Sequence, residues 1–162
     1  PGAAVFDERV LGDCRLGRMA AVEAAEPLAT VLADGGPIAL LDAEQRQDDP
    51  AGALHLTLYW TAAAPVKGNY TVFTQLFDAS GAMIAQQDNV PVGGTAPTAT
   101  WQPGAIVRDP YQLTLPAAAA PGPRTLHIGL YDAQGRQTVR LADGTEADHL
   151  TLQIEPELTD AE

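Results

Sequence analysis

The sequence predicts an all-β domain folded as a sandwich, and three observations carry this prediction. From Ile38 onward, apolar residues alternate with polar ones over short segments, which is the period of a half-buried strand. Proline and glycine, 13 and 15 residues in all, recur between these segments and mark turns. Almost no stretch has the 3.6-residue period of an amphipathic helix. Six or seven such strands indicate an immunoglobulin-like or jelly-roll sandwich, two topologies that a string of strands does not separate.

The first half of this region contains three expected strands. Residues 54–60 alternate strictly and place four large apolar groups on one face, namely Leu54, Leu56, Leu58 and Trp60. Tyr70–Asp78 follows a turn at 67–69 and is rich in the β-branched and aromatic residues that strands favour. Ala82–Val90 comes next along the chain. Trp60 shares its face with leucines, so we expect it in the core.

The second half begins with a loop dense in proline and glycine, Pro91–Gly104. Alternation resumes in Ile106–Leu115, where one face carries Tyr111, Leu113 and Leu115. Pro110 interrupts this segment and indicates a bulge or an edge position, because proline cannot donate to a strand ladder. Arg124–Ala133 and Leu150–Ile154 complete the expected strands.

One short pattern occurs twice. Leu76–Gly81 and Leu130–Gly135 both end an apolar strand with Asp, Ala, a variable residue and Gly. An Asp carboxylate can accept backbone N–H groups two residues on, and Gly can take positive φ, so the pattern suits a hairpin turn. The alternative, that Asp78 and Asp132 bind calcium, lacks the spacing of a calcium loop. We favour the turn.

The two ends of the chain are less regular. We expect residues 1–35 to form an N-terminal segment packed on a sandwich of residues 36–155, with 156–162 as a frayed acidic tail of the same domain. Within the N-terminal segment, the pattern favours a strand near Leu16–Ala24 and a short helical or irregular piece over Pro27–Ala33. The chain starts at Pro1 without a basic-then-apolar leader, and we expect it to be a segment of a longer protein.

Charge restricts the classes of partner. The 162 residues carry a net charge of −12, with a single lysine and eight arginines. Nucleic acid and anionic lipid surfaces both need clustered basic residues, so we expect neither as a partner. The acidity is typical of a soluble surface. A lone cysteine cannot form an intramolecular disulfide or a cysteine-based zinc site.

The sequence shows no recognisable catalytic set. Ser80, the only serine, lies in an expected turn without the elbow of serine hydrolases, and Cys14 matches no cysteine-protease pattern. His55 and His127 alternate with leucines and should face away from the core. Together with His149, they would suit zinc only if all three converged on one sheet face, and we favour scattered packing or surface histidines. No pair among the 21 acidic residues stands out as a glycosidase pair. We predict no catalytic residue, metal or cofactor.

Aromatic residues give the best binding signal. Trp101 lies in the loop, outside any alternating strand, where an indole could stack on a sugar. The alternative, which we favour, is that it folds back as a plug over the open end of the sandwich and buries its large ring. Asp109 and Tyr111 follow in the next expected strand. We assign Trp101, Asp109 and Tyr111 as the candidate ligand-binding residues.

Several segments together resemble a known family. They are Leu56–Trp60, Tyr70–Asp78, Ala85–Asp88, Pro97–Gly104, Asp109–Pro116 and Ile128–Asp132. Their order and spacing are similar to the β-sandwich domain at the C-terminal end of bacterial multi-pass membrane glycosyltransferases of the mannosyltransferase-like class. The resemblance covers roughly residues 27–154 and rests on framework strands and turns. A proline after Asp109 departs from the family pattern, and the N-terminal 26 residues match nothing in it.

The resemblance implies an accessory role. In that family the transmembrane part transfers the sugar and the β domain lies outside the cytoplasmic membrane, with no catalytic residue of its own. We therefore expect a non-catalytic, extracytoplasmic module of a larger membrane protein that contacts glycan or a cell-envelope protein. The alternative is an immunoglobulin-type interaction or inhibitor-like module that uses the 91–104 loop.

Overall fold

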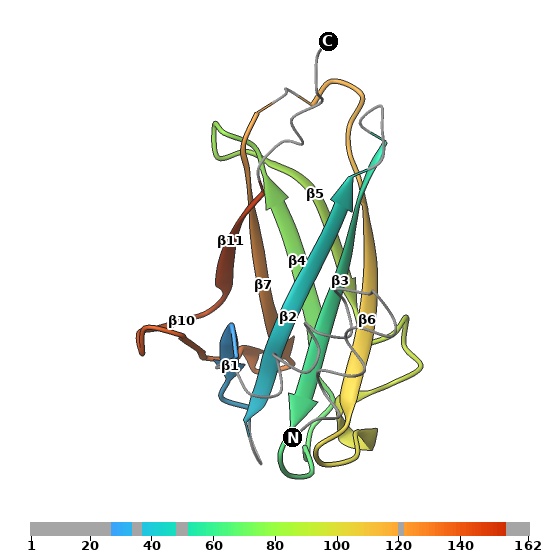
Figure 1. The fold of residues 1–162 in the computed structure, drawn as a ribbon, viewed down its shortest axis with the longest axis vertical. Helices are drawn as coiled ribbons and strands as arrows, with labels where there is room; N and C mark the ends of the chain where they lie inside the picture. The colour runs from blue at the N-terminus through green and yellow to red at the C-terminus, as the bar shows by residue number, and fades with distance from the viewer. Residues whose placement is uncertain (1–26, 34–36, 48–51, 120–121, 155–162) are drawn as a thin grey trace, which may run out of the picture.

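The structure, a computed structural model, describes residues 27–33, 37–47, 52–119 and 122–154 and has two antiparallel sheets packed face to face. The front sheet in Figure 1 has the order β10-β9-β1-β2-β3-β6, with strands Glu146–Ala147, Val139–Leu141, Ala29–Val31, Ile38–Gln47, Ala53–Ala62 and Ile106–Thr114. The back sheet has the order β11-β7-β4-β5, with strands Leu150–Ile154, Arg124–Asp132, Thr71–Phe77 and Met83–Asn89. Strand β8, Gly135–Arg136, extends it by pairing with β7. The predicted all-β sandwich is confirmed.

The strand order separates the two topologies that the sequence left open. Strand β6 returns to the front sheet beside β3, and β7 returns to the back sheet beside β4. In the lettering of immunoglobulin-like sandwiches, β2-β3-β6 correspond to A-B-E and β11-β7-β4-β5 to G-F-C-C′. The pairing order is therefore immunoglobulin-like. Pro110 lies on β6, the outermost strand of the front sheet, so its edge position is confirmed.

Strand β1 corrects one sequence-based expectation. A helical or irregular piece was expected over Pro27–Ala33, but Ala29–Val31 forms a strand between β2 and β9. Three residues are too few to show a period, and their extended form is imposed by two neighbouring strands that pair with them on both sides. The strand expected near Leu16–Ala24 and the acidic tail lie outside the described residues.

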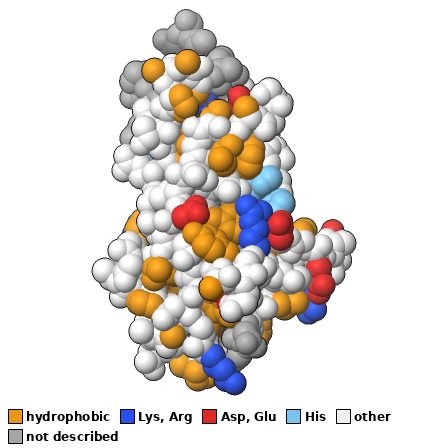
Figure 2. Space-filling model, turned by 180° about the vertical axis from the view of Figure 1, so that it is seen from behind, with side chains coloured by type: hydrophobic (Ala, Val, Ile, Leu, Met, Phe, Trp, Pro, Cys, Tyr) orange, Lys and Arg blue, Asp and Glu red, His pale blue; other side chains and the backbone are white. Residues whose placement is uncertain are grey.

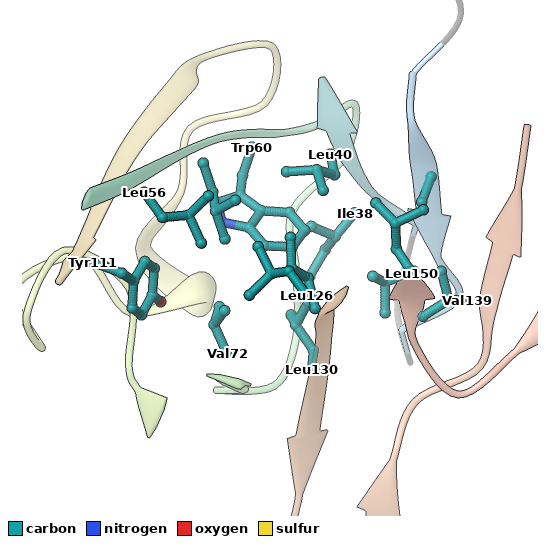
Figure 3. Packing of buried hydrophobic residues seen from close by; sticks show 14 of the residues in the cluster. Ile38, Leu40, Leu56, Trp60, Val72, Tyr111, Leu126, Leu130, Val139 and Leu150 are labelled. Atoms are coloured by element: carbon teal, nitrogen blue, oxygen red, sulfur yellow. The ribbon is translucent and has the colours of Figure 1, made fainter. Parts of the chain in front are cut away.

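The core fills the space between the sheets. Alternate residues of β3 point inward, and Trp60 lies in the middle of the cluster with Leu126 and Leu130 from the opposite sheet (Figure 3). Trp60 is 1% exposed, so its predicted core position is confirmed. At about 25 cal/mol for each Å² of apolar surface removed from water, large side chains of this kind supply most of the stabilisation. Their outward-facing neighbours form the two outer surfaces.

The repeated Asp-Ala-x-Gly pattern forms turns. Asp78 Oδ1 accepts hydrogen bonds from the backbone N–H groups of Ser80 at 2.9 Å and Ala82 at 3.1 Å, while Gly81 adopts a φ of 88°. Asp132 Oδ1 accepts the N–H of Gln134 at 2.9 Å. These bonds are those of the predicted hairpin turns, which are confirmed.

Candidate functional site

The three residues assigned from the sequence as ligand contacts all lie in the core. Trp101, Tyr111 and Asp109 are 6%, 3% and 0% exposed. The Trp101 Nε1–H donates to the carbonyl of Ala96 at 2.9 Å, and the ring packs in the hydrophobic cluster. The plug interpretation of Trp101 agrees with this position. Ligand contact by these residues stays a prediction, and the solvent-facing candidates lie elsewhere.

Asp109 is the centre of a buried hydrogen-bond network. Its Oδ2 accepts from Trp60 Nε1–H at 3.1 Å and from the Tyr111 hydroxyl at 2.7 Å, and its Oδ1 accepts from the backbone N–H of Val92 at 2.7 Å. Burial raises the pKa of Asp109, although the three hydrogen bonds act in the opposite direction. Val92 has a φ of 56°, a left-handed conformation that is rare for a β-branched residue. The network joins β3, β6 and the 91–104 loop.

The three histidines do not share one face. His55 lies on β3 and lines a hollow on the outer surface of the front sheet, whereas His127 and His149 stack on the back sheet with ring centroids 4.0 Å apart. The alternative in which all three converge is wrong. Among the described residues, no group of three His, Cys, Asp or Glu side chains is arranged to hold a metal ion.

The outer face of the back sheet gathers aromatic side chains into two rows. Register sets them side by side, because His127 lies opposite Gln75 and Gly129 lies opposite Phe73 on the neighbouring strand β4. Figure 2 looks onto this face and shows histidine atoms in pale blue beside a basic side chain in blue, with hydrophobic groups nearby. We call this surface the aromatic face. Its first row is Phe77, His127 and His149, and its second row is Phe73 and Tyr131.

The first row crosses the sheet from β4 to the start of β11. The rings of Phe77 and His127 have centroids 4.5 Å apart and planes inclined by 43°, and His127 and His149 are stacked with an interplanar angle of 24°. All three side chains are partly exposed. The row therefore exposes three neighbouring rings, inclined to one another, to solvent.

The second row is built on a glycine. Phe73 is only 1% exposed because its ring lies over Gly129, where a Cβ would be 2.5 Å from the Phe73 Cζ. The Arg136 guanidinium covers the same ring, 4.1 Å from its centroid, in a cation–π contact. Tyr131, partly exposed, is 6.3 Å from Phe73 by ring centroids and donates its hydroxyl to Asp88 at 3.1 Å.

Polar groups fill the space between the rows. Arg136 donates to Asp148 at 3.3 Å and to the Gln75 side-chain carbonyl at 3.2 Å, and His149 Nδ1 is hydrogen-bonded to Asp148. That bond to His149, with the nearby Arg136 charge, holds the pKa of Asp148 below its usual range. The guanidinium is thus fixed in place while its charge is offset locally.

A groove of about 500 Å³ opens at one end of the aromatic face. It is lined by Phe77, Asp78, Ala79, Gly81, Pro123, Thr125, His127 and Gln153. A second hollow, of about 490 Å³, lies on the front sheet and is lined by Glu44, Gln45, Arg46, His55, Leu56, Thr57, Arg108, Pro110 and Tyr111. The groove beside Phe77 combines partly exposed rings with polar groups, as ligand sites commonly do. We therefore take this groove, together with the aromatic face, as the candidate site.

The pH dependence of stability should report on His127. Burial lowers the pKa of His127 below its usual 6.5, with the charges of His149 and Arg136 acting in the same direction and Asp148 opposing them. A base of this kind contributes stability that is present above the unfolded pKa of about 6.5 and lost as pH falls through the folded value. We therefore expect His127→Phe, which keeps a ring but cannot titrate, to lose less stability on acidification than the wild type.

Urea unfolding at about pH 7.5 and about pH 5 measures this difference, since the unfolded His127 titrates between these values. Asp148 titrates below this window because its pKa lies below 3.8. Equal losses in His127→Phe and the wild type would contradict the assignment.

One sequence feature could have indicated this site but was not used to predict it. In the repeated pattern, the residue before each Asp is aromatic, Phe77 in one copy and Tyr131 in the other. Both point outward, one into each row of the aromatic face. Their placement beside His149 and Arg136 depends on the pairing of distant strands, which the sequence pattern alone does not give.

Comparison with known proteins finds no match, either to a family model or to a curated protein. Within the described residues, no helix is long and apolar enough to cross a membrane.

Proposed function

We propose that this chain is a non-catalytic accessory domain that binds glycan on its aromatic face. The observation that carries the proposal is the pair of aromatic rows with Arg136, Gln75 and Asp148 between them. The apolar C–H faces of a sugar ring pack on aromatic rings, while its hydroxyls pair with amide, guanidinium and carboxylate groups. Rings with a few fixed polar groups are the usual lining of a small-molecule site.

The parent protein and its location belong to the same proposal. The framework segments resemble the extracytoplasmic β domain of membrane glycosyltransferases, so we place this domain outside the cytoplasmic membrane as part of a larger glycosyltransferase-like protein. A net charge of −12 disfavours nucleic acid and anionic lipid as ligands. Glycan held near the membrane enzyme would be the advantage of such a module.

Calorimetric titration with chito-oligosaccharides and manno-oligosaccharides, chosen after a glycan array, tests the proposal. We expect the wild type to bind at least one series and His127→Ala to bind it about tenfold more weakly, because one stacking ring is removed. His55→Ala, a histidine on the opposite outer face, should bind like the wild type. Thermal unfolding of both variants controls for folding. No binding to any glycan by the wild type, or equal binding by His127→Ala, would contradict the proposal.

One observation favours a second candidate, an interaction or inhibitor-like module that uses the 91–104 loop. The loop is fixed by the Asp109 bond to Val92 and by a backbone bond from Ala96 to Pro91 at 3.1 Å, while Gly93–Thr95 stays exposed. A preorganised loop loses less entropy on binding. If the 91–104 loop binds an envelope protein, Thr95→Arg should abolish that binding. If the domain binds glycan on its aromatic face, Thr95→Arg should leave the glycan titrations unchanged.

A further inference from the structure

The two aromatic rows lie too far apart for one sugar to contact both. His127 and Tyr131, one in each row, are four residues apart on the same strand, β7. A strand advances about 3.3 Å per residue, so the two positions are separated by about 13 Å. A single pyranose ring is comparable in size to one phenol ring. It would occupy one row and leave the other empty.

The groups between the rows can bind the sugars that connect them. Arg136 is exposed, lies between the two rows, and has its guanidinium fixed by Phe73, Gln75 and Asp148. A planar guanidinium with several N–H donors can bind hydroxyl oxygens while keeping these contacts. The aromatic face thus offers stacking, then hydrogen bonding, then stacking along β7.

The charges of this surface match a neutral ligand. Arg136 lies 3.3 Å from Asp148, and a second carboxylate, Asp88, accepts the Tyr131 hydroxyl at 3.1 Å. One arginine is therefore set against two aspartates on a domain of net charge −12. A polyanionic glycan would meet repulsion here, because nearby like charges are not compensated.

We infer that the ligand is a linear, neutral oligosaccharide that lies along β7 from the groove beside Phe77 to Tyr131, with one sugar stacked on each aromatic row. This inference rests on the proposed glycan-binding function and specifies its substrate class. Once one sugar of an oligosaccharide is stacked on the first row, another sugar of the same molecule is held close to the second row. The affinity should therefore grow with oligosaccharide length until both rows are occupied.

The test is calorimetric titration of the wild type, His127→Ala and Tyr131→Ala with chito-oligosaccharides and manno-oligosaccharides from monosaccharide to hexasaccharide. We expect affinity of the wild type to rise with chain length and then level off. Each variant should bind the hexasaccharide about tenfold more weakly and lose the rise with length, because only one row remains. His55→Ala is the matched control, and thermal unfolding checks that each variant is folded.

The outcomes separate the inference from the proposal on which it rests. A monosaccharide that binds as tightly as the hexasaccharide, or a Tyr131→Ala variant with wild-type affinity for every length, would overturn the inference and leave glycan binding standing. Tighter binding of a polyuronate than of the neutral oligomers would overturn its neutrality. Absence of binding across both series and the array would overturn the proposed function itself.

Discussion

Replacing Asp109 with alanine is expected to lower the free energy of unfolding by about 2–4 kcal/mol, because buried donors that lose their acceptor cost about 1–3 kcal/mol each. Three donors are affected: the Trp60 indole N–H, the Tyr111 hydroxyl and the Val92 backbone N–H. Removal of a buried carboxylate recovers part of this cost, since Asp109 is fully buried and burial raises its pKa. The net loss remains large because no described side chain other than Asp109 accepts from Trp60 Nε1.

Urea unfolding followed by tryptophan fluorescence measures this loss and reports on the site, since one of the two tryptophans donates to Asp109. Asp88→Ala is the matched control: Asp88 is an exposed aspartate that accepts one hydrogen bond from Tyr131. It should change stability by less than about 0.5 kcal/mol. A loss no larger in Asp109→Ala than in Asp88→Ala would show that the network is not a stabilising element.

The pH dependence of Asp109 gives an independent readout. A carboxyl with a raised folded pKa contributes stability that is complete below the unfolded pKa of about 3.8 and is lost as pH rises through the folded value. Asp109→Asn keeps the shape but cannot titrate. The stability difference between wild type and Asp109→Asn should therefore shrink as pH rises from about 3.5. A difference that is constant or grows with pH would contradict a raised pKa.

Period-two alternation was sufficient to predict strands such as β3, but it did not single out the equally long β2, Ile38–Gln47, whose sequence does not alternate. Residues 54–60 gave β3 and its inward face, since burial of one face is enough to hold a half-buried strand in place. Strand β1 was missed because its three residues have no period of their own and are extended by pairing with β2 and β9. Strands β8 and β10 are two residues each, too short to show a period, and each pairs with the strand just before it along the chain. Local pattern cannot reveal a strand whose cause is elsewhere in the chain.

In the candidate site, too, local alternation accounts for some features and pairing with distant strands for the others. Asp109 shares the inward face of β6 with Tyr111 and Leu113, but its burial was not predicted, because aspartate is usually exposed and it was assigned as a ligand contact. Its donors could not be predicted, since Trp60 and Val92 are brought to it by register and by a loop. The aromatic face depends on register still more. His127 meets Phe77 and His149 only because β7 pairs with both β4 and β11.

Replacing Gly129 with alanine is expected to cost about 3 kcal/mol of stability, at the upper end of what overpacking costs. The added Cβ would lie 2.5 Å from Phe73 Cζ and 3.0 Å from the backbone carbonyl oxygen of Asp148. Gly129 is not among the described glycines with positive φ, so the cost is steric rather than conformational. The Phe73 ring has little room to move, because Arg136 lies 4.1 Å above its centroid. Urea or thermal unfolding measures the loss.

A double-mutant cycle with Phe73→Leu separates this clash from a general intolerance of side chains at Gly129. Leucine lacks the two ring atoms that the new Cβ would meet at 2.5 and 2.6 Å. We therefore expect the double variant to be more stable than the sum of the single losses predicts, with a coupling of about 1–2 kcal/mol, as is typical of residues in contact. Additive losses would place the clash at the Asp148 carbonyl instead. A double variant that is more stable than the sum predicts would show that glycine is required at position 129 because the Phe73 ring lies directly against the β7 backbone. The Arg136 guanidinium, fixed above that ring, prevents the ring from moving away.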